Sequence, residues 1–236
     1  MKGVFIASLL VMGTYGAVAN AQEAGQPSYF ERRMRAPLEA FEIGVSGAYN
    51  QGFGNLTDTA STPIGSRRLQ DTAGAGGGAE LDLSYRFLPE MAAGVFAGGS
   101  QYDPQNMPGG TDVQSLAAGL QGQWFFRPYR TINPWVGLAS AYRGFWISPD
   151  VGGVTQRHGW EIARLQVGVD FRASKEISIG PYVGGAVDVF FSETLPGQTA
   201  RNLSGPPASG FVNAGILGRF DLGGTYVDEA TRVSKR

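Results

Sequence analysis

The chain lacks cysteine altogether and has a single histidine among its 236 residues. The absence of cysteine excludes a disulfide framework, a thiolate metal site and a cysteine nucleophile. The net charge of −1 offers no field that would attract a polyanion, so we expect no nucleic-acid partner. After the first residues no run of about 18 apolar residues occurs, which excludes a transmembrane helix. No motif predicts a cofactor or a metal ion.

Lysine, and charge in general, are scarce. Charged residues make up 17% of the chain, against about 25% in a typical soluble domain. Beyond the first residues, Lys175 and Lys235 are the only lysines. The 36 glycines are about twice the usual share and are spread through apolar segments. A surface that faces water normally carries many lysines, so this composition argues against an ordinary soluble domain.

The N-terminus has the three-part pattern of a secretory signal peptide. Met1 and Lys2 form a short positive start, a largely apolar stretch covers residues 4–18, and small residues follow at 19–21. The apolar stretch is short for a membrane span, so we favour a cleaved signal peptide over residues 1–21 rather than an anchor. We interpret residues 22–39 as a periplasmic lead-in and residues 223–236 as a polar C-terminal tail.

From residue 40 to residue 222, apolar residues alternate with polar or small ones with a period of two, which is typical of β-strands. Leu165 and Val167, for example, alternate with Arg164 and Gln166. Several of the predicted strands reach the roughly 9–11 residues that a tilted strand needs to cross a bilayer. The eight predicted strands cover residues 41–50, 79–87, 91–101, 113–126, 135–147, 160–174, 182–191 and 211–222.

The connections between the strands alternate in length. Those after the first, third, fifth and seventh strands are longer or richer in Gly, Pro, Asn and Thr, whereas the others are mostly shorter. Long extracellular loops and short periplasmic turns are typical of an outer-membrane barrel, although residues 127–134 and 174–181 are long for turns. We expect residues 51–75 and 192–209 to be exposed outside the cell, because their composition leaves little apolar surface to bury.

Alternation alone does not decide which face is inside, because a soluble lipocalin-type barrel has an apolar interior and also shows period two. The polar face favours the membrane arrangement: it consists mainly of small residues with single charges, and these charges nearly cancel. Charges in a narrow lumen must be paired to offset desolvation. The predicted lumen network consists of Glu42, Glu80, Asp82, Asp170, Asp188 and Asp221 with Arg86, Arg143, Arg164, Arg172 and Arg219.

Aromatic residues near both ends of the strands predict two girdles at the depth of the lipid headgroups. The periplasmic girdle would contain Tyr85, Phe87, Trp124, Phe126, Trp135, Phe171 and Phe220, and the outer girdle Tyr49, Tyr102, Phe145, Trp146, Trp160, Phe190 and Phe211.

One pairing within the lumen follows from the antiparallel order of the strands. Asp188 is expected near the height of Arg164, close enough to pair with it directly or across one diagonal step. Arg143, on the preceding strand, would repel Arg164 without this acid.

Together these features resemble the small outer-membrane β-barrel proteins of Gram-negative bacteria, such as the OmpA transmembrane domain and OmpX. The resemblance covers roughly residues 40–222 and rests on pattern, including the final strand FVNAGILGRFDL. It implies an all-β fold, an eight-stranded antiparallel up-and-down transmembrane β-barrel with a polar, charge-paired lumen. It also implies contact with outer-membrane lipid and lipopolysaccharide, and with the barrel assembly machinery during biogenesis. Many members end at a terminal Phe, whereas this chain continues to residue 236.

The leading functional hypothesis is a non-enzymatic membrane anchor that presents extracellular loops, for envelope integrity or surface adhesion. A narrow passive pore or small-ligand channel is an alternative, although eight strands enclose little more than their own side chains. A lipid-modifying enzyme is a second alternative. Such barrel enzymes resemble serine hydrolases with a His and a Ser close together on a strand, and His158, expected in an outer loop, is followed by Gly159 and Trp160 instead.

Overall fold

The computed structural model describes residues 36–56, 68–104, 107, 109–203 and 205–225. The predicted signal peptide, most of the predicted lead-in and most of the predicted tail lie outside these residues. Within them, a short helix, α2 (Leu69–Thr72), follows the first strand, and no helix has the length and apolar character needed to cross a membrane. The strands are β1 (Ala40–Gly54), β2 (Ala75–Leu88), β3 (Met91–Tyr102), β4 (Asp112–Phe125), β5 (Ile132–Ser148), β6 (Thr155–Arg172), β7 (Ile177–Thr194), β8 (Arg201–Asn202) and β9 (Ala208–Leu222).

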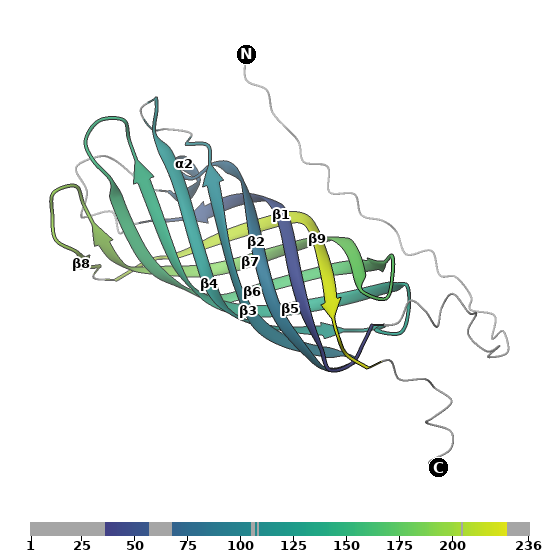
Figure 1. The fold of residues 1–236 in the computed structure, drawn as a ribbon. Coiled ribbons are helices and arrows are strands. Elements are labelled where there is room, and N and C mark those ends of the chain that lie inside the picture. Colours follow the sequence, from purple (N-terminus) through teal and green to yellow (C-terminus); the bar gives the residue numbers. More distant parts are fainter. Residues whose placement is uncertain (1–35, 57–67, 105–106, 108, 204, 226–236) are drawn as a thin grey trace, which may run out of the picture.

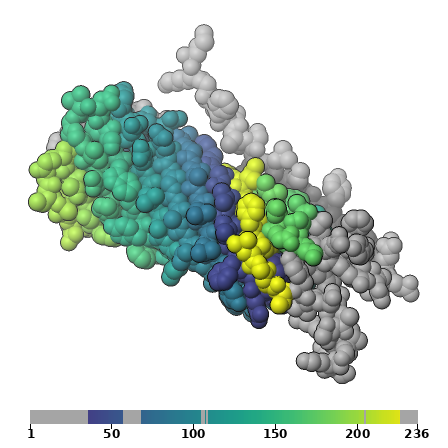
Figure 2. Space-filling view, in the orientation of Figure 1, coloured from purple at the N-terminus to yellow at the C-terminus, as the bar shows by residue number. Residues whose placement is uncertain are grey.

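Eight long strands among the described residues form one closed antiparallel barrel, as predicted (Figure 1). Each strand from β1 to β7 pairs with the next along the chain, β7 also pairs with β9, and β1 pairs with β9 to close the wall. Figure 2 shows β1 in purple beside β9 in yellow on the outer surface. The two-residue strand β8 pairs only with the end of β7. Closure leaves the long strands without unpaired edges, which a lipid environment requires.

The two ends of the barrel differ in their connections. Because β5 begins at Ile132 and β7 at Ile177, the turns before them cover only residues 126–131 and 173–176, shorter than predicted. We call the end with these turns the turn end and the opposite one the loop end. The first and last described segments meet at the turn end, where Leu38 pairs with Thr225.

The apolar face of the strands points outward. Leu120 and Leu138 are 68% and 62% exposed, and Leu165 and Val167 are also exposed, whereas Arg164 is buried in the lumen. A soluble lipocalin-type barrel would show the opposite arrangement. The outer surface is therefore an apolar belt that fits lipid, and this overturns the soluble alternative.

Candidate functional site

The half of the lumen nearer the turn end contains a set of ion pairs that we call the turn-end cluster. Glu42 accepts hydrogen bonds from Arg86 Nη2 and Arg219 Nη1, each over 2.5 Å. Arg219 Nε lies 3.1 Å from Asp170 Oδ2. A further pair joins Arg172 Nη1 to Asp221 Oδ2 at 2.6 Å. All six side chains are buried, and their charges balance: Glu42, Asp170 and Asp221 with Arg86, Arg172 and Arg219.

Aromatic rings line the turn-end cluster. Arg86 Cζ lies 3.9 Å from the ring centroid of Phe125, and Arg219 Cζ lies 4.6 Å from that of Trp135. These contacts place cations over the negative faces of the rings. Trp135 is only 2% exposed, so its predicted place in the periplasmic girdle is wrong. Its position in the alternation of β5 points it inward, although it lies near a strand end.

A second set of ion pairs, the middle cluster, crosses the lumen farther from the turn end. Arg164 Nε donates to Glu161 Oε1 over 2.6 Å, and Arg143 Nη2 donates to Glu161 Oε2. Arg143 Nε also donates to Asp188 Oδ1 over 2.7 Å, and Arg164 Nη1 to Glu80 Oε2 over 2.5 Å. The result is an alternating chain across the lumen, in the order Asp188, Arg143, Glu161, Arg164 and Glu80.

The predicted pairing of Asp188 with Arg164 is wrong. Asp188 pairs with Arg143, and Glu161 lies between the two arginines that were expected to repel each other. The prediction did not include Glu161, because strict alternation along the strand from Arg164 points it toward lipid.

A β-bulge in β6 explains the error. The register of β6 shifts between Glu161 and Ala163 against β7, and Ile162 and Ala163 both face outward. The extra residue turns Glu161 back into the lumen, so that Glu161 and Arg164, three positions apart, share one face. In the sequence, the signal for this bulge is the pair of successive apolar residues, Ile162 and Ala163, between the charged residues Glu161 and Arg164.

Asp82 lies inside the barrel between the two clusters, and no ion pair is found for it among the described residues. Its Oδ1 accepts a hydrogen bond of 3.0 Å from Gln121 Nε2. Of the eleven residues predicted for the lumen network, ten are buried, and Glu80 keeps 15% of its side chain exposed.

Between the middle cluster and the loop end, the lumen contains a layer of aromatic rings. Ring centroids of Tyr102 and Phe145 lie 6.2 Å apart, those of Tyr102 and Phe211 6.0 Å, and those of Phe145 and Phe190 5.9 Å. These four residues are buried, so their predicted place in the outer girdle is wrong. All four occupy inward positions of their strands.

The first loop contributes to this apolar layer. Leu56 and Leu69 are 1% and 0% exposed and belong to the same cluster as the four rings. The expectation that residues 51–75 bury little apolar surface is therefore wrong for these two leucines. α2 brings Leu69 to the mouth of the barrel, which residue composition does not reveal.

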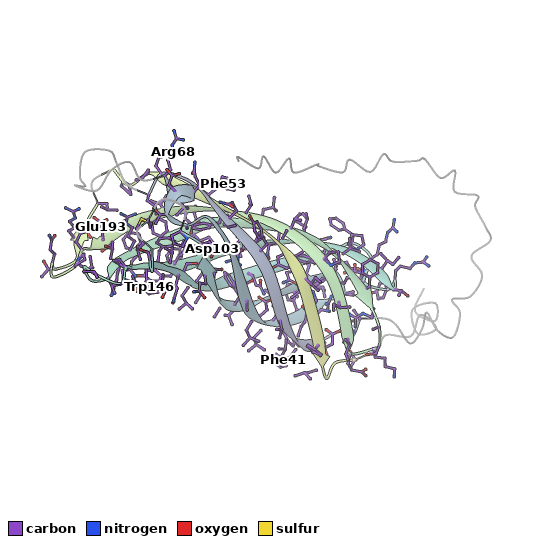
Figure 3. All side chains as sticks on the ribbon, turned by 90° about the horizontal axis from the view of Figure 1, so that it is seen from above. Phe41, Phe53, Arg68, Asp103, Trp146 and Glu193 are labelled. Carbon is purple, nitrogen blue, oxygen red and sulfur yellow. The ribbon has the colours of Figure 1, made fainter. Side chains whose placement is uncertain are left out.

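A third group of charges, absent from the predicted network, lies at the loop end. Glu193 is fully buried and accepts hydrogen bonds from Arg157 Nη2 and from Arg201 Nη2, each over 2.7 Å. Glu193 thus contradicts the predicted exposure of residues 192–209, whereas residues 196–202 are exposed. Figure 3 shows Glu193 toward the loop end, far from Phe41.

The other predicted girdle residues face outward. Trp146 is half-buried because its ring lies against Gly144 and at 6.3 Å from the ring of His158. The exposed ones, between 38% and 60%, are Tyr49, Tyr85, Phe87, Trp124, Phe126, Trp160, Phe171 and Phe220.

His158 lies within β6 and not in a loop, which corrects its predicted position. Its ring stacks on that of Tyr142, with centroids 5.8 Å apart, on the outer face of the barrel. The neighbouring hydroxyl of Ser140 accepts from Trp160 Nε1 and donates to the carbonyl oxygen of Glu161, both over 2.9 Å. Across the described ranges, no three His, Asp or Glu side chains gather as they would around a metal ion.

Comparisons with known proteins agree with this architecture. No protein-family model matches the chain. A protein of Rickettsia prowazekii (strain Madrid E), provisionally named outer membrane protein RP075, is 26% identical over 173 residues, and the match covers 72% of this chain but only 63% of that relative.

One solved outer-membrane protein has the same fold. The outer membrane protein OprG from Pseudomonas aeruginosa superposes with a TM-score of 0.50 at 12% identity, covering 80% of this chain and 99% of OprG. Neisserial surface protein A gives a TM-score of 0.47 at 15% identity, covering 75% of this chain and 95% of that one.

Proposed function

We propose that this protein, a β-barrel of the Gram-negative outer membrane, is a non-enzymatic anchor that presents its loop end at the cell surface. The single observation that supports this role is the closed lumen. Two ion-pair clusters and an apolar layer fill it in succession from the turn end to the loop end. A barrel filled in this way serves as a rigid support. The contacts with the exterior are then made by the loops.

The filled lumen argues against the pore alternative. Arg143, Glu161 and Arg164 are each at most 5% exposed and are tied to one another, so solute passage would require several buried charges to separate. Separating such pairs without new partners is costly. The purified protein in a planar bilayer should therefore give no discrete conductance steps, with a trimeric porin as the positive control. Stable unitary steps would contradict the proposal.

The arrangement around His158 argues against the enzyme alternative. The hydroxyl of Ser140 is engaged by Trp160 and by the Glu161 carbonyl, and the His158 ring is stacked on Tyr142. Neither group is set up as a nucleophile with a base. Lipid A and phospholipids extracted from cells with and without the protein should have identical mass spectra, and a mass shift that disappears in His158→Ala would establish an enzyme.

The loop end offers two exposed tips for contact with the exterior. Residues 151–154 and 196–202 are exposed in the structure, and Val151 is 89% exposed. An epitope inserted after Gly152 or Gly197 should be accessible to antibody on intact cells, whereas one after Lys175, in the turn 173–176, should not.

A loop-trimmed variant tests presentation against a purely mechanical role. Replacing residues 196–200 and 151–153 by minimal turns leaves the strands and both ion-pair clusters intact. If the loops carry the function, this variant should still reach the outer membrane but should not restore surface attachment in a deletion strain. Full restoration by the trimmed barrel would refute the proposal and indicate that the barrel alone supports the envelope.

A further inference from the structure

A groove on the outer wall of the barrel lies toward the loop end, where β2, β4 and β6 begin and β3 and β5 end. Its volume is ≈ 960 Å³. Trp146 lines it, and Figure 3 shows this residue toward the loop end, as it does Glu193. The groove is continuous with the apolar belt, because Leu116 lines the groove and is 53% exposed on the outer face. A lipid of the surrounding membrane is therefore the molecule that meets this groove.

The floor of the groove is almost bare backbone. Strand pairing sets Ala79 of β2 beside Gly99 of β3, and Gly99 beside Leu116 of β4, all facing outward. A Cβ atom on Gly77, which also lines the groove, would meet no atom within 4 Å. A Cβ atom on Gly99 would make only ordinary contacts, the nearest 3.6 Å from the carbonyl oxygen of Ser115. The wall would thus accept larger residues here, and the small ones leave space for a chain of methylene groups.

Glutamine side chains form the side of the groove nearer the loop end. Gln101 of β3 pairs with Gln114 of β4 in the register of the sheet. Gln114 in turn lies beside Trp146, and Trp146 beside Gln156, so these four residues follow one row across the wall. Among the described residues, no hydrogen bond is found for the three side-chain amides. An amide without a partner is unfavourable next to hydrocarbon, so these groups need hydrogen-bonding atoms from outside the chain.

The chemistry of the lining selects the kind of lipid headgroup. All described residues that line the groove are uncharged. A phosphate group would lack a counter-charge here, whereas neutral hydroxyl and amide groups can both donate to glutamine and accept from it. Trp146 adds a broad apolar surface beside these amides. The groove is thus polar toward the loop end and apolar toward the turn end, which matches a lipid with a neutral hydrogen-bonding headgroup that points to the loop end.

We propose that this groove binds an acylated sugar, with one acyl chain along Ala79, Gly99 and Leu116 and with sugar hydroxyl or amide groups at Gln101 and Gln114. In the outer leaflet of a Gram-negative outer membrane this lipid is lipopolysaccharide, whose lipid A part consists of glucosamine units with amide-linked and ester-linked acyl chains. The assignment to this leaflet rests on the proposed function, in which the loop end lies at the cell surface. The fit between the groove and an acylated sugar is independent of that orientation.

Lipid binding to the purified protein in detergent provides the first test. In native mass spectra, the delipidated protein should bind lipid A, with or without its phosphates, in preference to a phosphatidylethanolamine with the same acyl chains. Gly99→Leu fills the groove and should weaken the binding of lipid A by about tenfold, since the acyl chain loses its contact with the wall. Gly122→Leu is the matched control and should leave binding unchanged. Gly122 has equal room for a Cβ atom but lies near the turn end of β4, outside the groove.

A double variant, Gln101→Leu/Gln114→Leu, tests recognition of the headgroup separately from that of the acyl chain. It should still bind both lipids but should lose the preference for lipid A. The proposal would be overturned if the unchanged protein showed no preference, or if removal of the phosphates abolished the preference. It would also be overturned if Gly99→Leu bound lipid A as tightly as Gly122→Leu does, or if the preference survived the loss of both amides.

Photo-crosslinking in cells provides a second test and distinguishes the groove from the orientation of the barrel. A benzophenone amino acid at Val154, which lines the groove and is 42% exposed, should crosslink to lipopolysaccharide. Gly99→Leu should reduce this product but not the product formed from Val212, an exposed residue in the loop half of β9. Equal products from Val154 with and without Gly99→Leu would refute the groove alone. Crosslinks to lipopolysaccharide from Ile132, at the turn end, in place of Val154 would show that the barrel is inverted and would refute the proposed function.

Discussion

Replacing Arg219 by methionine is the sharpest test of the charged lumen. Arg219 is 1% exposed and pairs with two acids, Glu42 and Asp170. In Arg219→Met, Glu42 keeps its pair with Arg86, but Asp170 loses the only ion-pair partner found for it among the described residues. Breaking a buried pair by removing one partner costs about 3–5 kcal/mol, because the other charge stays buried. We expect a loss of this size in the free energy of unfolding.

The double variant Arg219→Met/Asp170→Asn separates charge from packing. If the uncompensated carboxylate of Asp170 causes the loss of stability, the second substitution should recover most of the lost free energy of unfolding. The coupling energy between the two substitutions should then be at least about 2 kcal/mol. Ile216→Met, at a lipid-facing position of the same strand that is 58% exposed, is the matched control and should change stability by less than about 1 kcal/mol. Reversible urea unfolding in lipid vesicles, followed by the shift between folded and unfolded bands on unboiled gels, gives these values. The reasoning would be refuted if the free energy of unfolding of Arg219→Met lay within about 1 kcal/mol of that of the unchanged protein. It would also be refuted if the double variant were no more stable than Arg219→Met.

Three further predictions follow from the two faces of the wall. Val167→Arg should impair assembly by roughly 2–4 kcal/mol near the middle of the bilayer, and more than Gln166→Arg, because Val167 faces outward whereas Gln166 is buried on the polar lumen side. Folding yields in vesicles compare the two variants, and the reverse order would contradict the assignment of inner and outer faces. In single-tryptophan variants, brominated lipids should quench Trp124, which is 45% exposed, but not Trp135, which is 2% exposed; equal quenching would place Trp135 in the girdle after all. Gly144→Val should shift the emission of Trp146 and cost about 1–3 kcal/mol, since a Cβ there would lie 2.3 Å from the indole ring; an unchanged spectrum would contradict this packing.

Much of the architecture follows from the sequence because it depends on a local rule. Side chains along a strand alternate between two faces, so Leu165 and Arg164 must point in opposite directions wherever the strand lies. The scarcity of lysine, together with the small residues on the charged face, then indicated that the charged face was inside. Strand number, antiparallel order and the inward position of residues such as Arg219 and Asp188 required no more than this pattern.

What the alternation could not supply is the point at which it breaks. The bulge at Ile162 and Ala163 adds one residue to β6 against its neighbours, and this reverses the face of Glu161. Since a bulge is decided by pairing with two other strands, only the tertiary structure shows that Glu161, rather than Asp188, separates Arg143 from Arg164.

The tertiary structure also decided what fills the loop end of the lumen. Phe145 and Phe211 look like interfacial aromatics when only their distance from a strand end is considered. Closure of the barrel brings their inward faces together with Leu56 and Leu69, which come from a loop that the composition describes as polar. The sequence by itself determined which residues share a face. Which side chains meet across the lumen depends on register, shear and loop conformation, because these join residues that are distant along the chain.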